Sequence, residues 1–341
     1  MYHKHRARTL LSLIISILFL VSGCKDNTDA KDNNTSAVNQ TAVEANSPPP
    51  EEFDYKFNPH VISEEYELIY GEDINGEFFS FCDAILEKES TFPCESSERF
   101  HKLLSISNSC FPLAQELIDK DKTFAENGEC HLVYRYDDEA IDDIIRSFKS
   151  KVTDVISSAV TYKEPDFIKA MELFTAVANK DTYDSSSTLD DALNLRGYRA
   201  IMEDTGICQE IASEYIYYLL QIGINALPCS SLNANQTEAH EWVLVKLEDE
   251  YFHMDPTYET NYPESLYFFG MDDIQREYYG DFPKENYTYA NSEVLSDLSA
   301  DSRFFEKLWL AEKYEIDHMG RKITVTEIDT GEQYKYGFGD N

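Results

Sequence analysis

The chain has 341 residues, of which 64 are acidic and 29 are basic, so its formal net charge at pH 7 is −35. This balance argues against nucleic acid as a partner, because phosphates favour Lys and Arg, and against broad electrostatic adhesion to anionic lipid. An acidic surface of this kind serves solubility. The chain after its first fifty residues is aromatic-rich and long enough for a large core, in one elaborate domain or two small ones.

Residues 1–23 have the pattern of a signal peptide, with a positively charged head before the apolar run 10–21. That run is too short for a permanent membrane span. Two small residues and then Cys24 resemble a bacterial lipobox, which implies cleavage before Cys24 and lipid on its sulfur and new amino group. An ordinary secretory signal with a chance cysteine is the alternative. We expect a lipid anchor in the cell membrane, on the extracytoplasmic face.

Residues 24–54 follow as a predicted disordered tether. The part up to Pro50 is polar and has no aromatic residue, so it cannot bury enough apolar surface to offset the entropy of ordering. The three prolines at its end make that part stiff. We expect this segment to hold a folded body away from the lipid.

The cysteine count leaves several pairings open. With Cys24 assigned to lipid, Cys208 either stays free, which leaves Cys229 as the odd cysteine, or pairs with Cys229. No pair has C-x-x-C spacing, so we predict no zinc site. In an oxidising compartment, two bridges with three possible connectivities could form among the remaining four cysteines, which are Cys82, Cys94, Cys110 and Cys130.

Residues 55–136 are expected to form a mixed α/β region, with one helix through Ile85, another that begins after Ser96 or Ser97, and a strand over 129–136. The core, residues 137–275, opens with helices. Apolar residues recur at spacings of three and four for about five turns after Asp137, and the pattern repeats after Pro165. A polar break follows, with a short helix predicted over 189–195.

Cys208 stands at the head of another apolar stripe, in a helix that ends near Gly223. Asp204 and Thr205 are plausible caps. The first turn of a helix carries unpaired N–H groups and partial positive charge, so a thiol there ionises more readily, and the thiolate is the nucleophile. The alternative is that the cysteine packs as a small hydrophobe.

Downstream, residues 241–255 alternate like a hairpin that ends before a proline. A two-residue turn at Asp249 and Glu250 would place Asp255 opposite Leu244, on the face that also carries His240. A three-residue turn would put them on opposite faces. A helix-borne cysteine, a strand-borne histidine and a carboxylate on the next strand form a nucleophile, its base and the group that orients the base.

The flanking residues resemble the transglutaminase-like superfamily of papain-type folds. The resemblance rests on four stretches: Gly206-x-Cys208, "LLQIGINA" at 219–226, Ala239-His240-x-Trp242 and "YFHMDPTYE" at 251–259. It implies an α+β fold whose core packs helices on an antiparallel sheet, with Cys208, His240 and Asp255 as the catalytic residues. The sequence departs from the family at 209–212, where a Gly-Tyr-Ala stretch is common, and at Val243, where asparagine is common. These departures leave room for altered specificity or lost activity.

The neighbours of these residues have competing interpretations. His253 is a second candidate base, but it lacks the Ala-His-x-Trp setting. Trp242 could wall the site or belong to the core of the sheet, and Tyr258 could line the cleft or simply fill a loop. His131 and His318 are interpreted as surface residues. Asp272 and Asp273 are expected to cap a helix, and residues 276–341 form a C-terminal extension with a hairpin around 329–331.

The resemblance implies acyl transfer or hydrolysis on protein or peptide amides, with cell-wall peptide as one candidate substrate. A second hypothesis keeps the fold without chemistry, as a surface module that binds peptides or has a structural role. The triad itself does not distinguish transamidation from hydrolysis. We predict no cofactor and no metal, since the chain has no D-x-D-x-D-G calcium loop.

Overall fold

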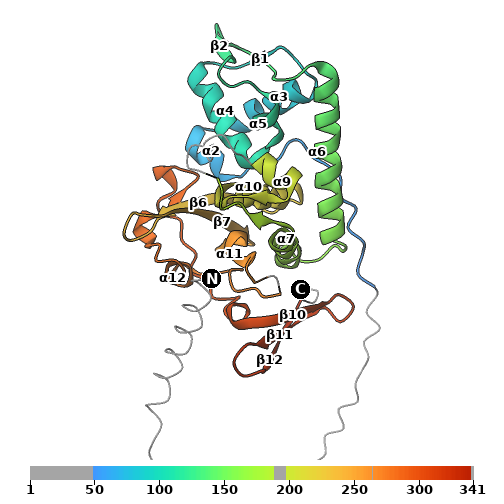
Figure 1. Ribbon diagram of the computed structural model, residues 1–341, viewed down its shortest axis with the longest axis vertical. Helices are drawn as coiled ribbons and strands as arrows, with labels where there is room; N and C mark the ends of the chain where they lie inside the picture. Colours follow the sequence, from blue (N-terminus) through green and yellow to red (C-terminus); the bar gives the residue numbers. More distant parts are fainter. Residues whose placement is uncertain (1–48, 188–196, 263, 339–341) are drawn as a thin grey trace, which may run out of the picture. The chain divides into compact units, whose positions relative to one another are not determined.

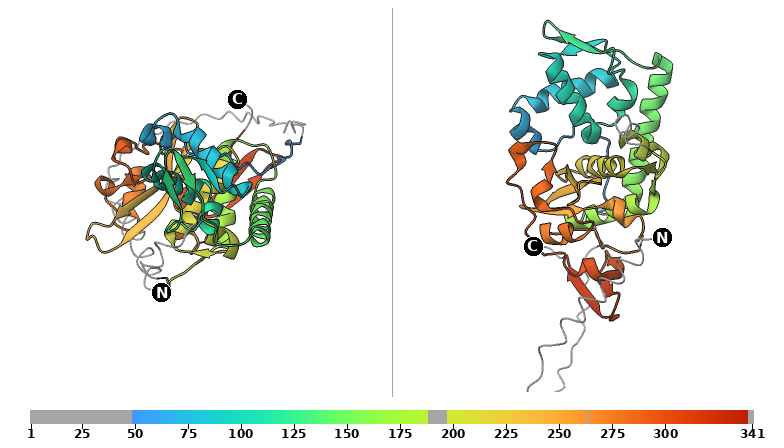
Figure 2. Two further views of the ribbon diagram at one scale, coloured as in Figure 1. Left: turned by 90° about the horizontal axis from the view of Figure 1, so that it is seen from above. Right: turned by 60° about the vertical axis from the view of Figure 1, so that its left-hand side comes forward.

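The computed structural model describes most of the chain, namely residues 49–187, 197–262 and 264–338. The predicted signal peptide, Cys24, the tether up to residue 48 and the predicted helix 189–195 lie outside these ranges. All described residues belong to the compact unit Pro48–Asn341 (Figures 1 and 2). No helix within the described ranges is both long enough and apolar enough to cross a membrane.

The predicted mixed region combines short helices with a small antiparallel sheet of order β1-β3-β2. The predicted cap is confirmed, because the Ser96 hydroxyl accepts a hydrogen bond from Arg99 N at 3.1 Å. The predicted strand 129–136 is shorter, since the chain from Val133 onward pairs with residues 117–119 instead. The bounds are α2 Glu65–Tyr70, α3 Ile74–Leu86, β1 Thr91–Pro93, α4 Ser97–Cys110, α5 Leu113–Leu117, β2 Phe124–Glu126 and β3 Glu129–His131.

The two long predicted helices are confirmed as α6 (Asp138–Ala159) and α7 (Asp166–Lys180). Asp137 caps α6 by accepting from Ala140 N at 3.0 Å, and the apolar stripe of α6 is its buried face. Near the connection between α6 and α7, Glu52 bridges Tyr162 in an antiparallel pair. The chain is therefore held against the folded body from about this residue onward.

A four-stranded antiparallel sheet and one buried helix form the centre of the described fold. The sheet has the order β8-β7-β6-β9, and α10 contacts β6 and β7 (Figure 1). Both faces of β7 are covered, because Trp242 and Leu244 on one face and Val243 and Val245 on the other are fully buried. The bounds are α9 Gly197–Glu203, α10 Cys208–Gln221, β6 Ala226–Leu232, β7 Ala239–Leu247, β8 Glu250–Met254 and β9 Thr288–Tyr289.

The predicted hairpin is present, but its predicted register is wrong by two residues. The turn is Glu248–Asp249, with Glu248 at φ 56°, and Leu244 pairs with His253 instead of Asp255. A slip of one residue would have moved Asp255 to the other face of the sheet. A slip of two keeps the face, so the inference that His240 and Asp255 share one side survives.

The C-terminal extension contains the predicted hairpin, β11 with β12, and an unpredicted strand β10 that completes a separate sheet of order β10-β11-β12. His318 is not a free surface residue: its Nδ1 lies 3.2 Å from Glu164 Oε2 and its Nε2 lies 3.4 Å from Glu172 Oε1. The bounds are α11 Pro256–Glu259, α12 Asp273–Tyr278, η1 Lys284–Asn286, η2 Glu293–Leu295, η3 Leu308–Leu310, β10 Ala311–Asp317, β11 Lys322–Glu327 and β12 Gln333–Gly337.

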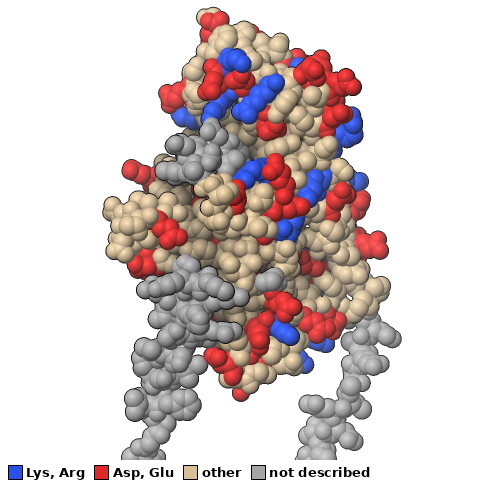
Figure 3. All heavy atoms as spheres, viewed as in Figure 1, with Lys and Arg blue, Asp and Glu red and all other residues tan. Residues whose placement is uncertain are grey.

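The predicted α+β class with helices on an antiparallel sheet is confirmed. On the face drawn in Figure 3, Asp and Glu side chains are widely spread and the Lys and Arg side chains lie among them. This distribution agrees with the acidic composition, in which mixed charges keep the surface soluble.

Candidate active site

Cys208 is the first residue of α10, and the residues around it hold the start of that helix firmly. Ile207, not Asp204 or Thr205, is the N-cap. The predicted caps were wrong because Thr205 and Gly206 form a short parallel strand, β5 (Thr205–Gly206), with β4 (Thr182–Tyr183), which keeps the chain extended for two more residues.

A buried ion pair fixes this helix start. The Glu210 carboxylate accepts a hydrogen bond from Ile207 N at 3.0 Å, and the Arg199 guanidinium binds both Glu210 oxygens, at 3.0 and 2.6 Å. The other terminal nitrogen of Arg199 contacts Asp184 at 2.8 Å, directly after Tyr183. The segment that carries Cys208 and the segment that carries Tyr183 are therefore joined by one charged network.

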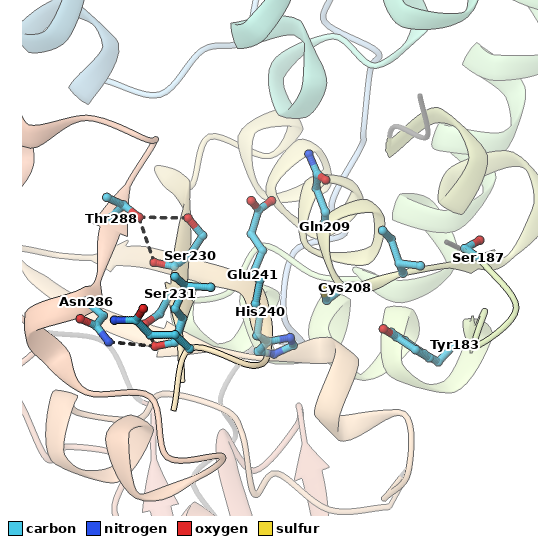
Figure 4. Close-up of a pocket in the computed structure, with 14 residues that line it drawn as sticks. Tyr183, Ser187, Cys208, Gln209, Ser230, Ser231, His240, Glu241, Asn286 and Thr288 are labelled. Carbon is cyan, nitrogen blue, oxygen red and sulfur yellow. Dashed lines mark hydrogen bonds between the residues drawn. The ribbon is translucent and has the colours of Figure 1, made fainter. Parts of the chain in front are cut away.

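Cys208 opens into a cavity of about 570 Å³. Figure 4 shows Tyr183 at one side of it with its hydroxyl directed toward Cys208 and His240, and Ser230 and Ser231 at the other side. None of the described residues that line the cavity is Lys or Arg. The lining residues are Tyr183, Ser187, Ile207, Cys208, Gln209, Ser230, Ser231, Leu232, Gln236, Ala239, His240, Glu241, Asn286 and Thr288.

His240 comes from β7 and is 95% buried, since its side chain keeps an exposed fraction of only 5%. Its Nε2 lies 2.7 Å from Asp255 Oδ2, which leaves Nδ1 as the nitrogen for the Cys208 sulfur. Burial by itself lowers the pKa of His240, but the charge and hydrogen bond of Asp255, together with the interaction with Cys208, raise this pKa to about 9. The imidazole is therefore held where a positive charge is favoured.

Asp255 is fully buried at the end of β8, where it caps α11. Its Oδ1 accepts from Tyr258 N at 3.0 Å, while its Oδ2 accepts from both His240 Nε2 and Arg276, the latter at 3.2 Å. Burial alone raises the pKa of this carboxyl, yet the charges of His240 and Arg276 outweigh burial, so the pKa is lowered. Asp255 is thus kept as an anion in the interior.

Trp242 and Tyr258, predicted as weak substrate contacts, pack around His240 instead. The Tyr258 ring stacks on the His240 ring with centroids 4.5 Å apart, and the fully buried Trp242 lies 5.8 Å from it. Neither residue lines the cavity described above. They therefore fix the plane of the imidazole. For Trp242 this is the core packing that the sequence left open as an alternative, whereas Tyr258 lies in helix α11 and not in a loop.

His253, the second candidate base, is fully buried and has both ring nitrogens occupied. Its Nδ1 accepts from Trp242 Nε1 at 2.9 Å, and its Nε2 lies 2.8 Å from Asp273 Oδ1. Burial lowers the pKa of His253, and Asp273 offsets this only in part. His253 therefore stays neutral and holds Trp242, and it has no lone pair left for a thiol proton.

Sequence reasoning missed Arg276, which contacts Asp255 directly. It lies on α12 within the stretch that was expected only to cap a helix, a role that Asp272 does perform by accepting from Gln275 N at 2.6 Å. No spacing rule links Arg276 to Asp255, because the contact depends on how α12 packs against β8. A single arginine in an acidic segment is too weak a signal to have found it.

The six described cysteines are all free thiols. Cys229 lies on β6, where it pairs with Trp242 of β7. It is buried and is not bonded to Cys208, so the competing disulfide is absent. Within the described ranges, no group of three or more His, Cys, Asp and Glu side chains is arranged to hold a metal ion.

Comparisons with known proteins bear on the same segment. Residues 154–256 match the family model of the transglutaminase-like superfamily, and Cys208, His240 and Asp255 all lie in that range. The chain is similar to the crystal structure of a TGase, at 12% identity and a TM-score of 0.29, over 40% of this chain and 43% of that one. It is also similar to the crystal structure of a "putative cysteine protease" from Cytophaga hutchinsonii, at 13% identity and a TM-score of 0.28, over 51% of this chain and 68% of that one.

The chain thus spans less than half the length of the first of these structures. No curated protein matches it. The family match confirms the resemblance that the short motifs around Cys208, His240 and Asp255 predicted.

Proposed function

We propose that this chain, whose residues 154–256 belong to the transglutaminase-like superfamily, is a thiol enzyme that transfers or hydrolyses acyl groups of protein or peptide amides through Cys208, His240 and Asp255. One observation carries the proposal. The buried His240–Asp255 pair is 2.7 Å long and leaves the other imidazole nitrogen for Cys208, at the wall of an open cavity. A nucleophile, its base and an orienting carboxylate are the parts that acyl transfer requires.

The mechanism follows from this geometry. His240 Nδ1 accepts the thiol proton of Cys208, and the thiolate attacks the amide carbon to give a tetrahedral intermediate. When the C–N bond breaks, the nitrogen leaves with the proton from His240, and a thioester remains. An amine or a water molecule then attacks the thioester, passes its proton to His240, and releases Cys208. Asp255 holds the imidazole with Nε2–H donating, so that Nδ1 is the basic nitrogen.

The oxyanion of the intermediate needs donors. The backbone N–H of Cys208 belongs to the first turn of α10, where N–H groups have no partner within the helix. We assign the second donor to the Tyr183 hydroxyl, which faces the cavity from β4 (Figure 4). The pairing of Tyr183 with Gly206 in the β4–β5 ladder supports this assignment, because it ties the tyrosine to the strand that leads into Cys208.

We place the enzyme on the extracytoplasmic face of the cell membrane, anchored through lipid on Cys24. The support is the sequence of residues 1–24 alone. Growth of an expressing bacterium with a labelled fatty acid tests it. The wild-type chain is expected to carry the label and to sediment with membranes, and Cys24→Ser is expected to lose both properties; a labelled Cys24→Ser variant would contradict the anchor.

The activity is tested with the full chain in detergent. A thiol-reactive probe is expected to label Cys208, and casein with a fluorescent amine is expected to yield either labelled casein, which means transamidation, or fragments, which mean hydrolysis. Cys208→Ser is expected to abolish both outcomes. The matched control is Cys229→Ser, which removes a buried thiol that lies away from the cavity lining. If the folded wild-type chain neither reacts with the probe at Cys208 nor converts casein, the protein would instead be a binding module.

A further inference from the structure

Arg276 is a fully buried cation that contacts Asp255 from behind the candidate active site. Its guanidinium donates to Asp255 Oδ2 at 3.2 Å and to the backbone oxygen of Tyr279 at 2.6 Å, and its carbon centre lies 4.0 Å from the Trp242 ring centroid. The side chain has no exposed surface, and its Nε has no hydrogen-bond partner. Burying a charge in this way is costly, and well-packed apolar residues would stabilise the fold as well or better.

The contact with Asp255 is specific. The oxygen that accepts from Arg276 is the oxygen that accepts from His240 Nε2, so two cationic groups share one carboxylate oxygen. A carboxylate that serves one imidazolium alone would attract it with its full charge. A guanidinium on the same oxygen neutralises part of that charge and holds the carboxylate in one orientation.

The surroundings keep Arg276 in place. Trp242 forms the platform under the guanidinium, and the indole is itself held by its hydrogen bond to His253. The Phe282 ring lies 5.2 Å from the guanidinium carbon. An arginine held at this many points keeps its contact with Asp255 without paying much further conformational entropy.

We propose that Arg276 is a positioning residue for the reaction: through Asp255 Oδ2 it fixes the carboxylate against His240 and limits how strongly that carboxylate stabilises the imidazolium. The proposal rests on the proposed function and deepens it, since it assigns the balance of charge in the Cys208–His240 pair to a residue that acts through Asp255.

The other titratable groups around Asp255 and Arg276 set the conditions of the test. Glu259 needs particular care, because burial raises its pKa to about 8, within the range in which His240 titrates. Each variant is therefore compared with the wild type at every pH, so that the common background cancels. The groups are His240, Cys208, Tyr258, Glu259, His253, Asp273, Lys284, Cys229 and Tyr287.

The decisive experiment is an NMR titration of ring C–H signals in the full, histidine-labelled chain, with the His240 signal assigned from His240→Gln. In Arg276→Gln the guanidinium no longer neutralises part of the charge on Asp255 Oδ2, so the carboxylate attracts the imidazolium more strongly. The pKa of His240 is therefore expected to rise by about one unit, a tenfold change in the protonation ratio. The pH at which the rate of Cys208 alkylation changes on the alkaline side is expected to shift upward by the same amount. An unchanged or lower pKa in the folded variant would overturn the proposal.

The controls separate positioning from mere support of the fold. Arg303→Gln removes a largely exposed arginine that lies near Trp309 and pairs with Asp272, and it is expected to shift nothing. In an Asp255→Asn background, Arg276→Gln is expected to lose its upward effect on the pKa of His240, because the shared carboxylate is gone. A residue that only supports packing would change stability in both backgrounds without moving this pKa.

Arg276→Lys keeps the positive charge but removes the planar guanidinium group, which donates from two terminal nitrogens. Its single ammonium cannot reach Asp255 and the Tyr279 oxygen together, so an upward shift of about half a unit is expected. Should Arg276→Gln fail to fold, this variant decides the matter, and no shift in it would count against the proposal. Because the titration needs no substrate, a failure here is distinguishable from a failure of the proposed acyl transfer.

Discussion

Two buried histidines lie on the same sheet, each paired with a carboxylate that also contacts a cationic side chain, and their pKa values shift in opposite directions. His240 contacts Asp255, which Arg276 neutralises, and the pKa of His240 is raised to about 9. His253 contacts Asp273, which pairs with Lys284, and its pKa is lowered.

Besides burial, the positive charges of Arg276 and Lys284 lower the pKa of His253. The two rings also differ in what the second ring nitrogen faces. For His240 that nitrogen is left for the Cys208 thiol at the cavity, whereas for His253 it accepts from the Trp242 indole in the interior. A donor such as indole N–H requires a lone pair and so favours the neutral ring, while a thiol can give up its proton and leave an ion pair. A histidine, an aspartate and a cationic side chain thus form part of the candidate active site in one place and a structural brace in the other.

The largest expected effects come from removing one of the two histidines at a time. His240→Ala is expected to reduce the rate of acyl transfer at least about a thousandfold, because the thiol loses its base. His253→Gln is expected to leave that rate within about tenfold while lowering stability by about 1–3 kcal/mol, since a buried hydrogen-bond network is disturbed. Steady-state rates and urea unfolding measure both effects. Equal rate losses in the two variants would contradict the assignment.

The two carboxylates give the next contrast. Asp255→Asn is expected to lower kcat/KM about a hundredfold, because an amide no longer stabilises the imidazolium and its NH₂ group favours the wrong tautomer. Asp273→Asn is the matched control and is expected to act mainly on stability. The rate of Cys208 alkylation at pH 7 measures the same difference between Asp255→Asn and Asp273→Asn, and it needs no substrate. A rate loss in Asp273→Asn as large as in Asp255→Asn would show that the two sites are not separate.

The wall of the cavity opposite His240 is tested with Tyr183→Phe, which removes only the hydroxyl. If that hydroxyl stabilises the oxyanion, kcat is expected to fall about tenfold with KM nearly unchanged, since the bond forms mainly in the transition state. Leu232→Ala, at the other side of the cavity, is a control that alters the wall without a donor. A KM effect alone in Tyr183→Phe would reassign Tyr183 to substrate binding.

The smallest expected effect is on stability as a function of pH. The folded pKa of His240, about 9, exceeds the unfolded value, so its stabilisation is present below about pH 6.5 and is lost as the pH rises through 9. The folded pKa of His253 is lowered, so the unfolded state binds more protons on acidification and stability is lost as the pH falls below about 6.5.

His240→Gln is therefore expected to flatten the alkaline decline in the urea midpoint, and His253→Gln the acidic one. Circular dichroism at three pH values measures both slopes. If each variant flattened the opposite limb, the two pKa shifts would have been assigned to the wrong histidines.

Several parts of this fold follow from local patterns. The stripes of α6 and α7 repeat every three to four residues, and the caps at Ser96 and Asp137 are short-range contacts that a sequence reveals directly. The shared face of His240 and Asp255 follows from the two-residue period of strands, which is why it survived a wrong register.

Other parts depend on contacts that no local pattern encodes. The N-cap of α10 moved to Ile207 because Thr205 and Gly206 pair with residues 182 and 183, far back along the chain. Strand β10 was missed because its exposed and half-buried positions carry little hydrophobic signal.

The sequence by itself determined the residue types, their order and the secondary structure that carries Cys208, His240 and Asp255, because helices and strands follow from short-range periodicity. Only the tertiary structure decided that His253 braces Trp242 and that Arg276 reaches Asp255. The reason is physical: protonation and ion pairing depend on burial and on neighbours brought together by packing, and those neighbours lie on different elements of the chain.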